Sequence, residues 1–302
     1  MDLSPKWRFR LNRIQNRWQA WRASLRQTSQ AVTAEQKMCP SCRALVARGM
    51  AECPYCGQRL KVFAASPAGR IASRALPDIP VTGWLILANL LMFVLEYAVG
   101  HRLLFTHLMS GPGNAAELRL GASLPLGYIL ASHQYWRWVT ACFLHASLLH
   151  IGFNMWVLYD VGPMVESYFG GAKYLTLYLL TGIAGYIASS AYGYVSLGAS
   201  GAILGLFGVL IAYGLRRGYD QLRNFILRWV MYIFILAFFI PGVDNAAHLG
   251  GLVCGFLLGM VVGDDPPLTE SQVTRWNLIR WAMLGVVALS FYLMAVSPVR
   301  VV

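Results

Sequence analysis

A serine among glycines opens an apolar stretch of this chain, in the sequence GASGAILG at residues 198–205. Such a serine could cap a helix or fill a packing face of small residues. Gly198 lets the backbone turn sharply just before Ser200. A second glycine-rich stretch begins at His248, and glycines recur four residues apart in both: Gly201 and Gly205, then Gly251, Gly255 and Gly259. Because facing glycine strips let helices approach closely, we expect His248 to reach the Ser200 hydroxyl, as a base beside a nucleophile.

Two further polar residues, His150 and Asn154, are four residues apart and so share one helical face. Both side chains can donate hydrogen bonds, which a developing oxyanion needs once water is excluded. By themselves they would more often form a contact between helices. His145 could support them through a hydrogen bond, or be an ordinary residue of the membrane interface. We expect Asp244, four residues before His248, to cap a helix rather than complete a triad.

The elements that must position these residues are membrane-spanning helices. The chain is 57% hydrophobic and 13% charged, with a mean hydropathy of +0.51. These values exclude an ordinary soluble domain of 302 residues. Seven stretches approach the roughly 20 apolar residues that cross a bilayer. They are 81–99, 147–165, 174–192, 200–215, 225–241, 246–262 and 279–297. The sequence therefore predicts an all-α polytopic membrane protein.

The distribution of positive charge predicts the orientation in the membrane. Residues 1–80 hold 14 of the 25 lysines and arginines. With the N-terminus in the cytoplasm, 21 of the 25 basic residues lie on the cytoplasmic side. The four on the external side are Arg102, Arg119, Arg137 and Arg300. The positive-inside rule therefore predicts a cytoplasmic N-terminus and an external C-terminus. Residues 1–30 lack the apolar core of a cleavable signal peptide. In this orientation the residues that could do chemistry lie toward the external ends of their spans.

Residues 1–80 divide into three parts. Residues 1–30 place tryptophans and leucines on one helical stripe among arginines, which predicts a basic amphipathic helix on an anionic membrane surface, with a short coiled coil as the alternative. Residues 37–62 contain two CxxC pairs, which can aim four thiolates at one tetrahedral ion: Cys39, Cys42, Cys53 and Cys56. We predict a cytoplasmic zinc-ribbon-like module with a structural zinc ion, since disulfides are disfavoured there. A linker with three prolines follows at 63–80.

The stretch at 100–146, between the first two spans, is too long for a plain connection and too apolar for a disordered one. Long loops of this kind are usually functional. We expect short helices there, partly embedded in the membrane. Cys142 and Cys254, in or beside apolar segments, are expected to be inert packing thiols.

Three segments, WRWVTACFLHASLLHIGFNM, GASGAILGLFG and AHLGGLVCG, together resemble the motifs of the rhomboid family of intramembrane serine proteases, and they occur in the family's order. The resemblance implies a six-helix core over 81–263, to which residues 264–302 add a linker and a seventh helix. It also implies a Ser-His dyad without an acid, with Ser200 as nucleophile and His248 as general base. His150, Asn154 and the Ser200 backbone N–H would form the oxyanion site.

The resemblance further assigns Trp136 and Arg137 a scaffold role in the external loop. Some relatives carry a tyrosine four residues after the nucleophile, stacked on the catalytic imidazole. This chain has Leu204 there, so that stacking is absent.

The expected function is hydrolysis of a peptide bond in the transmembrane segments of other membrane proteins, within the lipid bilayer of a prokaryotic plasma membrane. Catalysis is expected to need no cofactor. The ribbon could bind a protein partner, and no nucleic acid is expected. The first alternative is a catalytically silent relative that binds membrane clients as a chaperone or scaffold, and the second is a transporter. Transporters usually show an inverted repeat or an acidic relay inside the spans, and neither is evident here.

Overall fold

The structure of the protein is a computed structural model that describes residues 36–38, 45–47, 52–54, 56–59, 80–100, 111–240, 242–264 and 270–297. The chain divides into two compact units, Met1–Asp78 and Ile79–Val302. The amphipathic helix predicted at 1–30, nearly all of the linker predicted at 63–80, and the predicted zinc ligands Cys39 and Cys42 lie outside the described residues.

In the first unit, strands β1 (Gln36–Met38) and β2 (Leu45–Ala47) form an antiparallel pair in which Gln36 is opposite Ala47. A turn follows around Cys53. The backbone N–H of Cys53 donates to the carbonyl of Gln58, and the N–H of Gly57 donates to the carbonyl of Cys53, both at 2.9 Å. Gly57 has a φ of +71°, a conformation that favours glycine. This turn brings Cys53 and Cys56 to one short loop.

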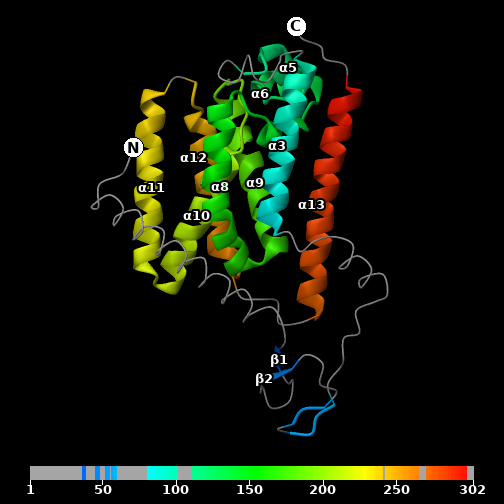
Figure 1. Ribbon diagram of the computed structural model, residues 1–302, viewed down its shortest axis with the longest axis vertical. Coiled ribbons are helices and arrows are strands. Elements are labelled where there is room, and N and C mark those ends of the chain that lie inside the picture. The colour runs from blue at the N-terminus through cyan, green and yellow to red at the C-terminus, as the bar shows by residue number, and fades with distance from the viewer. Residues whose placement is uncertain are drawn as a thin grey trace, which may run out of the picture. The chain divides into compact units, whose positions relative to one another are not determined.

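The second unit is a bundle of helices, shown in Figure 1. The long helices are α3 (Val81–Val99), α8 (Leu148–Phe169), α9 (Gly171–Ala191), α10 (Ser200–Arg217), α11 (Asp220–Phe239), α12 (Asn245–Val261) and α13 (Glu270–Val296). Each of the seven predicted apolar stretches forms one of them. The predicted bounds are too narrow where a helix continues past its apolar part. For example, α13 begins at Glu270 rather than near 279, because hydropathy detects only the part of a helix that matches hydrocarbon.

By length and composition, α3, α9, α10, α11 and residues 274–296 of α13 can each cross a membrane. A sixth span is possible if α8 is counted with the short helical segment before it, from which it is bent by 90°. Helix α12, with 17 residues, is shorter than the others. The structure thus gives five or six apolar spans among the described residues, against the seven predicted from the sequence.

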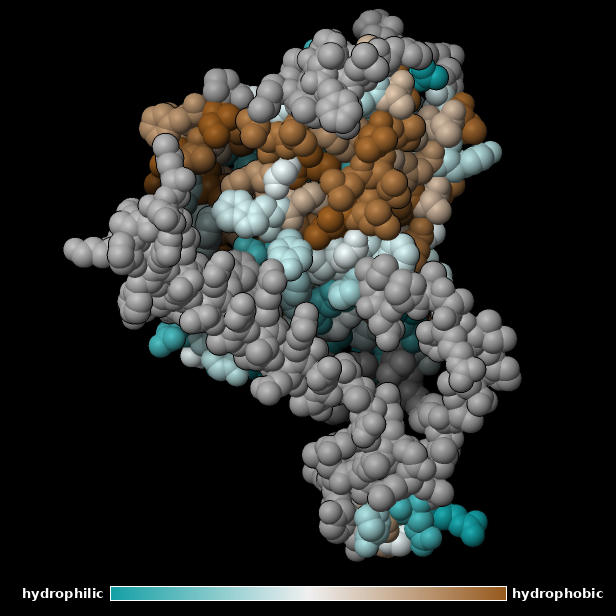
Figure 2. All heavy atoms as spheres, in the orientation of Figure 1, coloured by the Kyte–Doolittle hydropathy of each residue, from teal (hydrophilic) through white to brown (hydrophobic). Residues whose placement is uncertain are grey.

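The surface of the bundle is strongly apolar. Figure 2 shows a broad band of hydrophobic residues across it. Large apolar side chains point outward along α11 and α13, including Phe238, which is 81% exposed. A monomer in water rarely exposes so much contiguous apolar surface, whereas a bilayer solvates it. Helices suit that environment because each satisfies its backbone hydrogen bonds internally.

Helix α10 lies at the centre of the bundle, with α8, α9, α11 and α12 packed around it. Nearly every residue from Gly201 to Gly214 is buried. Its first residue is Ser200, so the bundle places this serine at one end of its most enclosed helix.

The stretch between α3 and α8 forms short helices, as predicted: α5 (Asn114–Arg119), α6 (Leu126–Ser132), α7 (Arg137–Thr140) and the 3-10 helix η1 (Ala141–Phe143). Arg137 connects these short helices through hydrogen bonds. Its guanidinium donates to the carbonyls of Leu118 and Ala122, both at 2.9 Å, and to the Gln134 side chain at 2.5 Å. Its Cζ lies 4.8 Å from the ring centroid of Trp136. A buried arginine held by three acceptors and an aromatic ring fixes these short segments to one another.

Candidate active site

Ser200 and His248 lie side by side although 48 residues separate them. His248 is in the first turn of α12, and its Nε2 is 2.9 Å from Oγ of Ser200. The imidazole is 6% exposed, and Ser200 is half-buried. A hydroxyl at hydrogen-bond distance from an imidazole nitrogen is the arrangement in which the imidazole can take its proton.

Glycines bring these two helices together, as the sequence predicted. A Cβ added at Gly251 would lie 2.0 Å from the carbonyl oxygen of Gly201, and one at Gly255 would lie 1.9 Å from that of Gly205. No side chain fits in either place, so the backbones of α10 and α12 are in direct contact. His248 lies one turn before Gly251, and this contact therefore carries its imidazole to Ser200.

The loop before α10 is held against α8 by Gly198. This residue has a φ of +129°, and an added Cβ would lie 2.7 Å from both Cε1 and Nε2 of His150. The Gly198 N–H donates to the carbonyl of Ala141 at 2.9 Å, and its carbonyl accepts from the Tyr186 hydroxyl at 2.6 Å. The loop is thereby fixed from both sides, and it can approach His150 only because residue 198 has no side chain.

His150 and Asn154 are one turn apart on α8, beside Gly198. Asn154 is 3% exposed, and its Nδ2 has no hydrogen-bond partner within the described part of the chain. Nδ1 of His150 accepts a long bond, 3.4 Å, from the N–H of Ala146, which leaves the proton of a neutral ring on Nε2. Two donors that face the loop before Ser200 are thus available for an oxygen that develops negative charge.

His145 does not make the side-chain hydrogen bond that was considered for it. Its ring is fully buried, and neither ring nitrogen has a partner among the described residues. The ring instead packs edge-on against that of His150, with centroids 5.1 Å apart. Its backbone N–H donates to the carboxylate of Glu96 on α3, at 3.1 and 3.2 Å. His145 is therefore fixed through its backbone and contacts His150 through ring packing.

Asp244 caps α12, as predicted. Its Oδ1 accepts from the N–H of Ala247 at 2.9 Å, and its Oδ2 accepts from the hydroxyl of Ser189 on α9. Nδ1 of His248 has no partner in the part of the chain that the structure describes. The geometry is therefore that of a serine and a histidine, with the nearby carboxylate engaged elsewhere.

Leu204 is buried, and no aromatic ring stands there to support the imidazole. Phe234 of α11 contacts His248, with ring centroids 6.2 Å apart and an angle of 89° between the planes. This edge-to-face geometry is favourable for aromatic rings. Phe234 therefore supplies an aromatic contact that the sequence motifs did not reveal.

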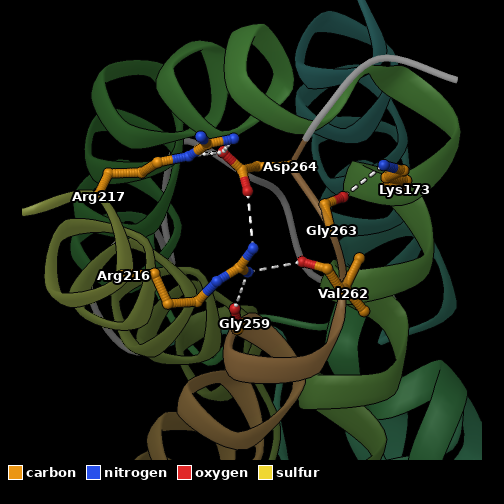
Figure 3. A network of polar contacts seen from close by, with 7 residues as sticks. All are labelled: Lys173, Arg216, Arg217, Gly259, Val262, Gly263 and Asp264. Carbon is orange, nitrogen blue, oxygen red and sulfur yellow. Dashed lines mark hydrogen bonds and ion pairs between the residues drawn. The ribbon is translucent and has the colours of Figure 1, made fainter. Parts of the chain in front are cut away.

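The opposite end of α12 is anchored by charged residues, as Figure 3 shows. Arg216 donates to the carbonyls of Gly259 and Val262, at 2.8 and 3.0 Å, which are otherwise unpaired at a helix end. Arg216 and Arg217 both bind the carboxylate of Asp264, at 2.9 and 2.6 Å. Burial alone would raise the pKa of Asp264, but the hydrogen bond and charge of Arg217, together with Arg216, hold it below the usual value.

Comparison with known proteins identifies the family. Residues 132–265 match the rhomboid domain. RHOMBOID-like protein 7 of Arabidopsis thaliana is 31% identical over 229 residues, which cover 66% of this chain and 72% of that protein. The chain belongs to the rhomboid family. Rhomboid protease GluP of Bacillus subtilis (strain 168) is 36% identical over 139 residues, 45% of this chain. Rhomboid-type serine protease 2 of Emericella nidulans is 32% identical over 165 residues, 52% of this chain.

The chain spans only 27% of the length of GluP and 33% of that of the Emericella protease. The matched rhomboid domain contains Ser200, His248, His150 and Asn154, whereas β1, β2 and α13 lie outside it. Family membership and the apolar helices together make this rhomboid protein an integral membrane protein.

Sequence reasoning missed two residues that shape the site, Tyr186 and Phe234. The Tyr186 hydroxyl donates to Gly198 and also reaches the carbonyl of Ala141 at 3.2 Å. A tyrosine inside an apolar helix is itself a signal, because its buried hydroxyl needs a partner. Phe234 carries no such signal, since a phenylalanine in a membrane helix most often faces lipid.

Proposed function

We propose that this rhomboid protein is an intramembrane serine endopeptidase that cleaves transmembrane segments of other membrane proteins. The observation that carries the proposal is the 2.9 Å approach of His248 Nε2 to Ser200 Oγ. A hydroxyl–imidazole pair is costly to place inside an apolar bundle, and such intramembrane groups usually mark function. The proteases GluP and Rhomboid-type serine protease 2 are relatives at 36% and 32% identity.

The chain's own residues support each step of acyl transfer. Ser200 Oγ attacks the carbonyl carbon of the scissile peptide bond while His248 Nε2 takes the hydroxyl proton. Negative charge develops on the carbonyl oxygen and is stabilised by His150, Asn154 and the Ser200 backbone N–H, which has no partner within its own helix. His248 then gives its proton to the leaving amine, so the C–N bond breaks and an acyl-Ser200 ester remains. Water activated by His248 hydrolyses that ester.

The proposed substrate is a transmembrane segment that enters beside α11. Along α11, from Asp220 to Phe239, only Ile226 and Ala237 are buried, so most of this helix is open to lipid. A substrate helix must unwind at the cleavage point, because an intact helix hides its carbonyls in its own hydrogen bonds. Small or helix-breaking residues at that point are therefore the expected preference.

We also propose the orientation predicted by charge, with Ser200 toward the outside of a prokaryotic plasma membrane and Arg216, Arg217 and Lys173 at the cytoplasmic end.

For the first unit we propose a structural zinc ion held by Cys39, Cys42, Cys53 and Cys56. Cys53 is 1% exposed and lies in a turn suited to a zinc knuckle, which fits two of the four ligands. The other two cysteines, Cys39 and Cys42, lie outside the described residues. Within the described residues, no three metal-ligating side chains form a cluster. A zinc ribbon commonly binds a protein partner, and we expect the same here.

The test is cleavage in liposomes. Purified protein is reconstituted with single-span membrane proteins of differing helix stability, and the products are identified by mass spectrometry. The proposal predicts products cut within or beside the span, formed by wild type and absent with Ser200→Ala. Binding of the substrates without any wild-type cleavage would instead support a catalytically silent client-binding protein.

A further inference from the structure

Helix α13 lies outside the matched rhomboid domain, and the catalytic proposal gives it no role. One stripe of α13 faces the bundle: Trp276, Met283, Val287, Ser290, Phe291 and Met294. The other side is exposed, for example at Trp281 and Tyr292, which are 64% and 62% exposed. These residues follow a helical repeat of three to four, so α13 is docked along its length rather than tethered at one point.

The N-terminal end of α13 is held by Lys173 of α9. Its Nζ lies 5.4 Å from the ring centroid of Trp276, and it also donates to the carbonyl of Gly263 (Figure 3). Farther along α13, Ser290 is 4% exposed, and its hydroxyl donates a hydrogen bond to the carbonyl of Val286 at 2.7 Å. A small residue whose polar group is satisfied by its own helix allows close packing between membrane helices.

The other end of α13 reaches the segment that leads into the active site. Figure 1 shows this end at the same end of the bundle as α5 and α6. The ring of Phe291 packs edge-on against that of Phe143 in η1, with centroids 5.6 Å apart and an angle of 62°. Met294 packs against a small buried cluster formed by Leu120, Ala122 and Leu144.

The same small cluster connects both halves of the site. Leu144 directly precedes His145, whose ring packs against His150. Leu197, three residues before Ser200, packs against the cluster from the loop that Gly198 belongs to. Met294 of α13 therefore touches a cluster that is joined both to the oxyanion donors and to the approach to the nucleophile.

We propose that α13 is a positioning helix, which through Phe291 and Met294 fixes the oxyanion donors of α8 relative to Ser200. Burial of apolar surface cannot be the reason for this docking, since lipid solvates the same side chains. What the docking supplies is a fixed geometry, and small displacements of catalytic groups lower rates strongly. The inference rests on the proposed protease function.

The test compares Phe291→Ala with Tyr292→Ala, in the full-length protein reconstituted in liposomes. Tyr292 is the adjacent aromatic residue on the exposed side of the same helix. We expect Phe291→Ala to lower kcat about tenfold with KM changed less than about twofold, because substrate binding is kept while geometry is lost. Phe291→Tyr, which keeps the ring, should restore the wild-type kcat. Tyr292→Ala should match wild type.

A second measurement separates positioning from folding. The rate constant for labelling of Ser200 by a fluorophosphonate is measured on the folded fraction. A variant that is only destabilised should label at the wild-type rate in that fraction. Phe291→Ala and Met294→Ala should each label several-fold more slowly. Should Phe291→Ala fail to fold, Met294→Ala alone decides the outcome. Wild-type kcat and labelling rates in the folded variants would overturn the role of α13, whereas an absence of wild-type labelling and cleavage would overturn the protease proposal itself.

Discussion

Replacement of Gly251 by alanine should remove most of the activity, although residue 251 is not one of the proposed catalytic groups. The added Cβ would lie 2.0 Å from the carbonyl oxygen of Gly201. Carbon and carbonyl oxygen atoms approach one another to about 3.3 Å at closest. Both atoms that collide belong to helix backbones or are fixed to one, so no side-chain rotation can relieve the contact. Helices α10 and α12 must therefore separate by more than about 1 Å.

That separation acts directly on the pair Ser200 and His248. His248 is one turn from Gly251 on the same helix, so its Nε2 should move from 2.9 Å to about 4 Å from the serine Oγ, beyond hydrogen-bond distance. Misplacement by 1 Å lowers rates about 100-fold. Overpacking of this kind also destabilises a fold by about 1–3 kcal/mol.

The assay is the rate of Ser200 labelling by a fluorophosphonate, per folded molecule, together with thermal unfolding. Gly285→Ala is the matched control, because an added Cβ at this glycine of α13 meets no atom within 4 Å. We expect a loss of about 100-fold for Gly251→Ala and none for Gly285→Ala. A Gly251→Ala protein that labels at the wild-type rate would refute the inference that the glycine contact sets the distance between nucleophile and base.

Three further predictions concern other parts of the molecule. Asn154→Ala should lower kcat by about 100-fold or more with little change in KM, because it removes a donor used in the transition state; an equal rise in KM would contradict that role. Asp264→Asn should lower the melting temperature at pH 7, since the ion pair of Asp264 with Arg216 and Arg217 is lost. Because the pKa of Asp264 is held low, wild type keeps this advantage above about pH 4 and loses it as the pH falls further. A difference in melting temperature that persists at pH 2 would contradict a stabilising role of this ion pair. Elemental analysis should find about one zinc ion per chain, absent after replacement of both Cys39 and Cys42 by serine, and a chelator should leave Ser200 labelling unchanged.

The sequence was sufficient for features set by the membrane itself. Hydrocarbon admits only segments that satisfy their own backbone, so apolar length alone located the helices, and α3 matches its predicted bounds of 81–99. The contact of Ser200 with His248 followed from glycine spacing, because backbone-to-backbone packing depends on residue type and helical period and on little else. Asp244 was assigned to its helix cap from position alone.

Contacts between distant segments could not be predicted in this way. Lys173 pairs with Gly263, 90 residues later, and Tyr186 with Gly198 through a loop whose path no local pattern determines. Phe234 and Phe291 read as ordinary lipid-facing residues, because aromatic rings on membrane helices give no periodic signal that separates a neighbouring helix from lipid. The bounds of α13 were missed for a related reason, since its first residues extend beyond the apolar part.

The most direct test of the account is covalent labelling of the purified protein by a fluorophosphonate, followed by peptide mapping. We predict that one serine is modified, that it is Ser200, and that labelling is abolished by Ser200→Ala and nearly abolished by His248→Ala. Equal labelling of all three proteins, or an adduct on a different serine, would contradict the assignment of Ser200 and His248 as nucleophile and base.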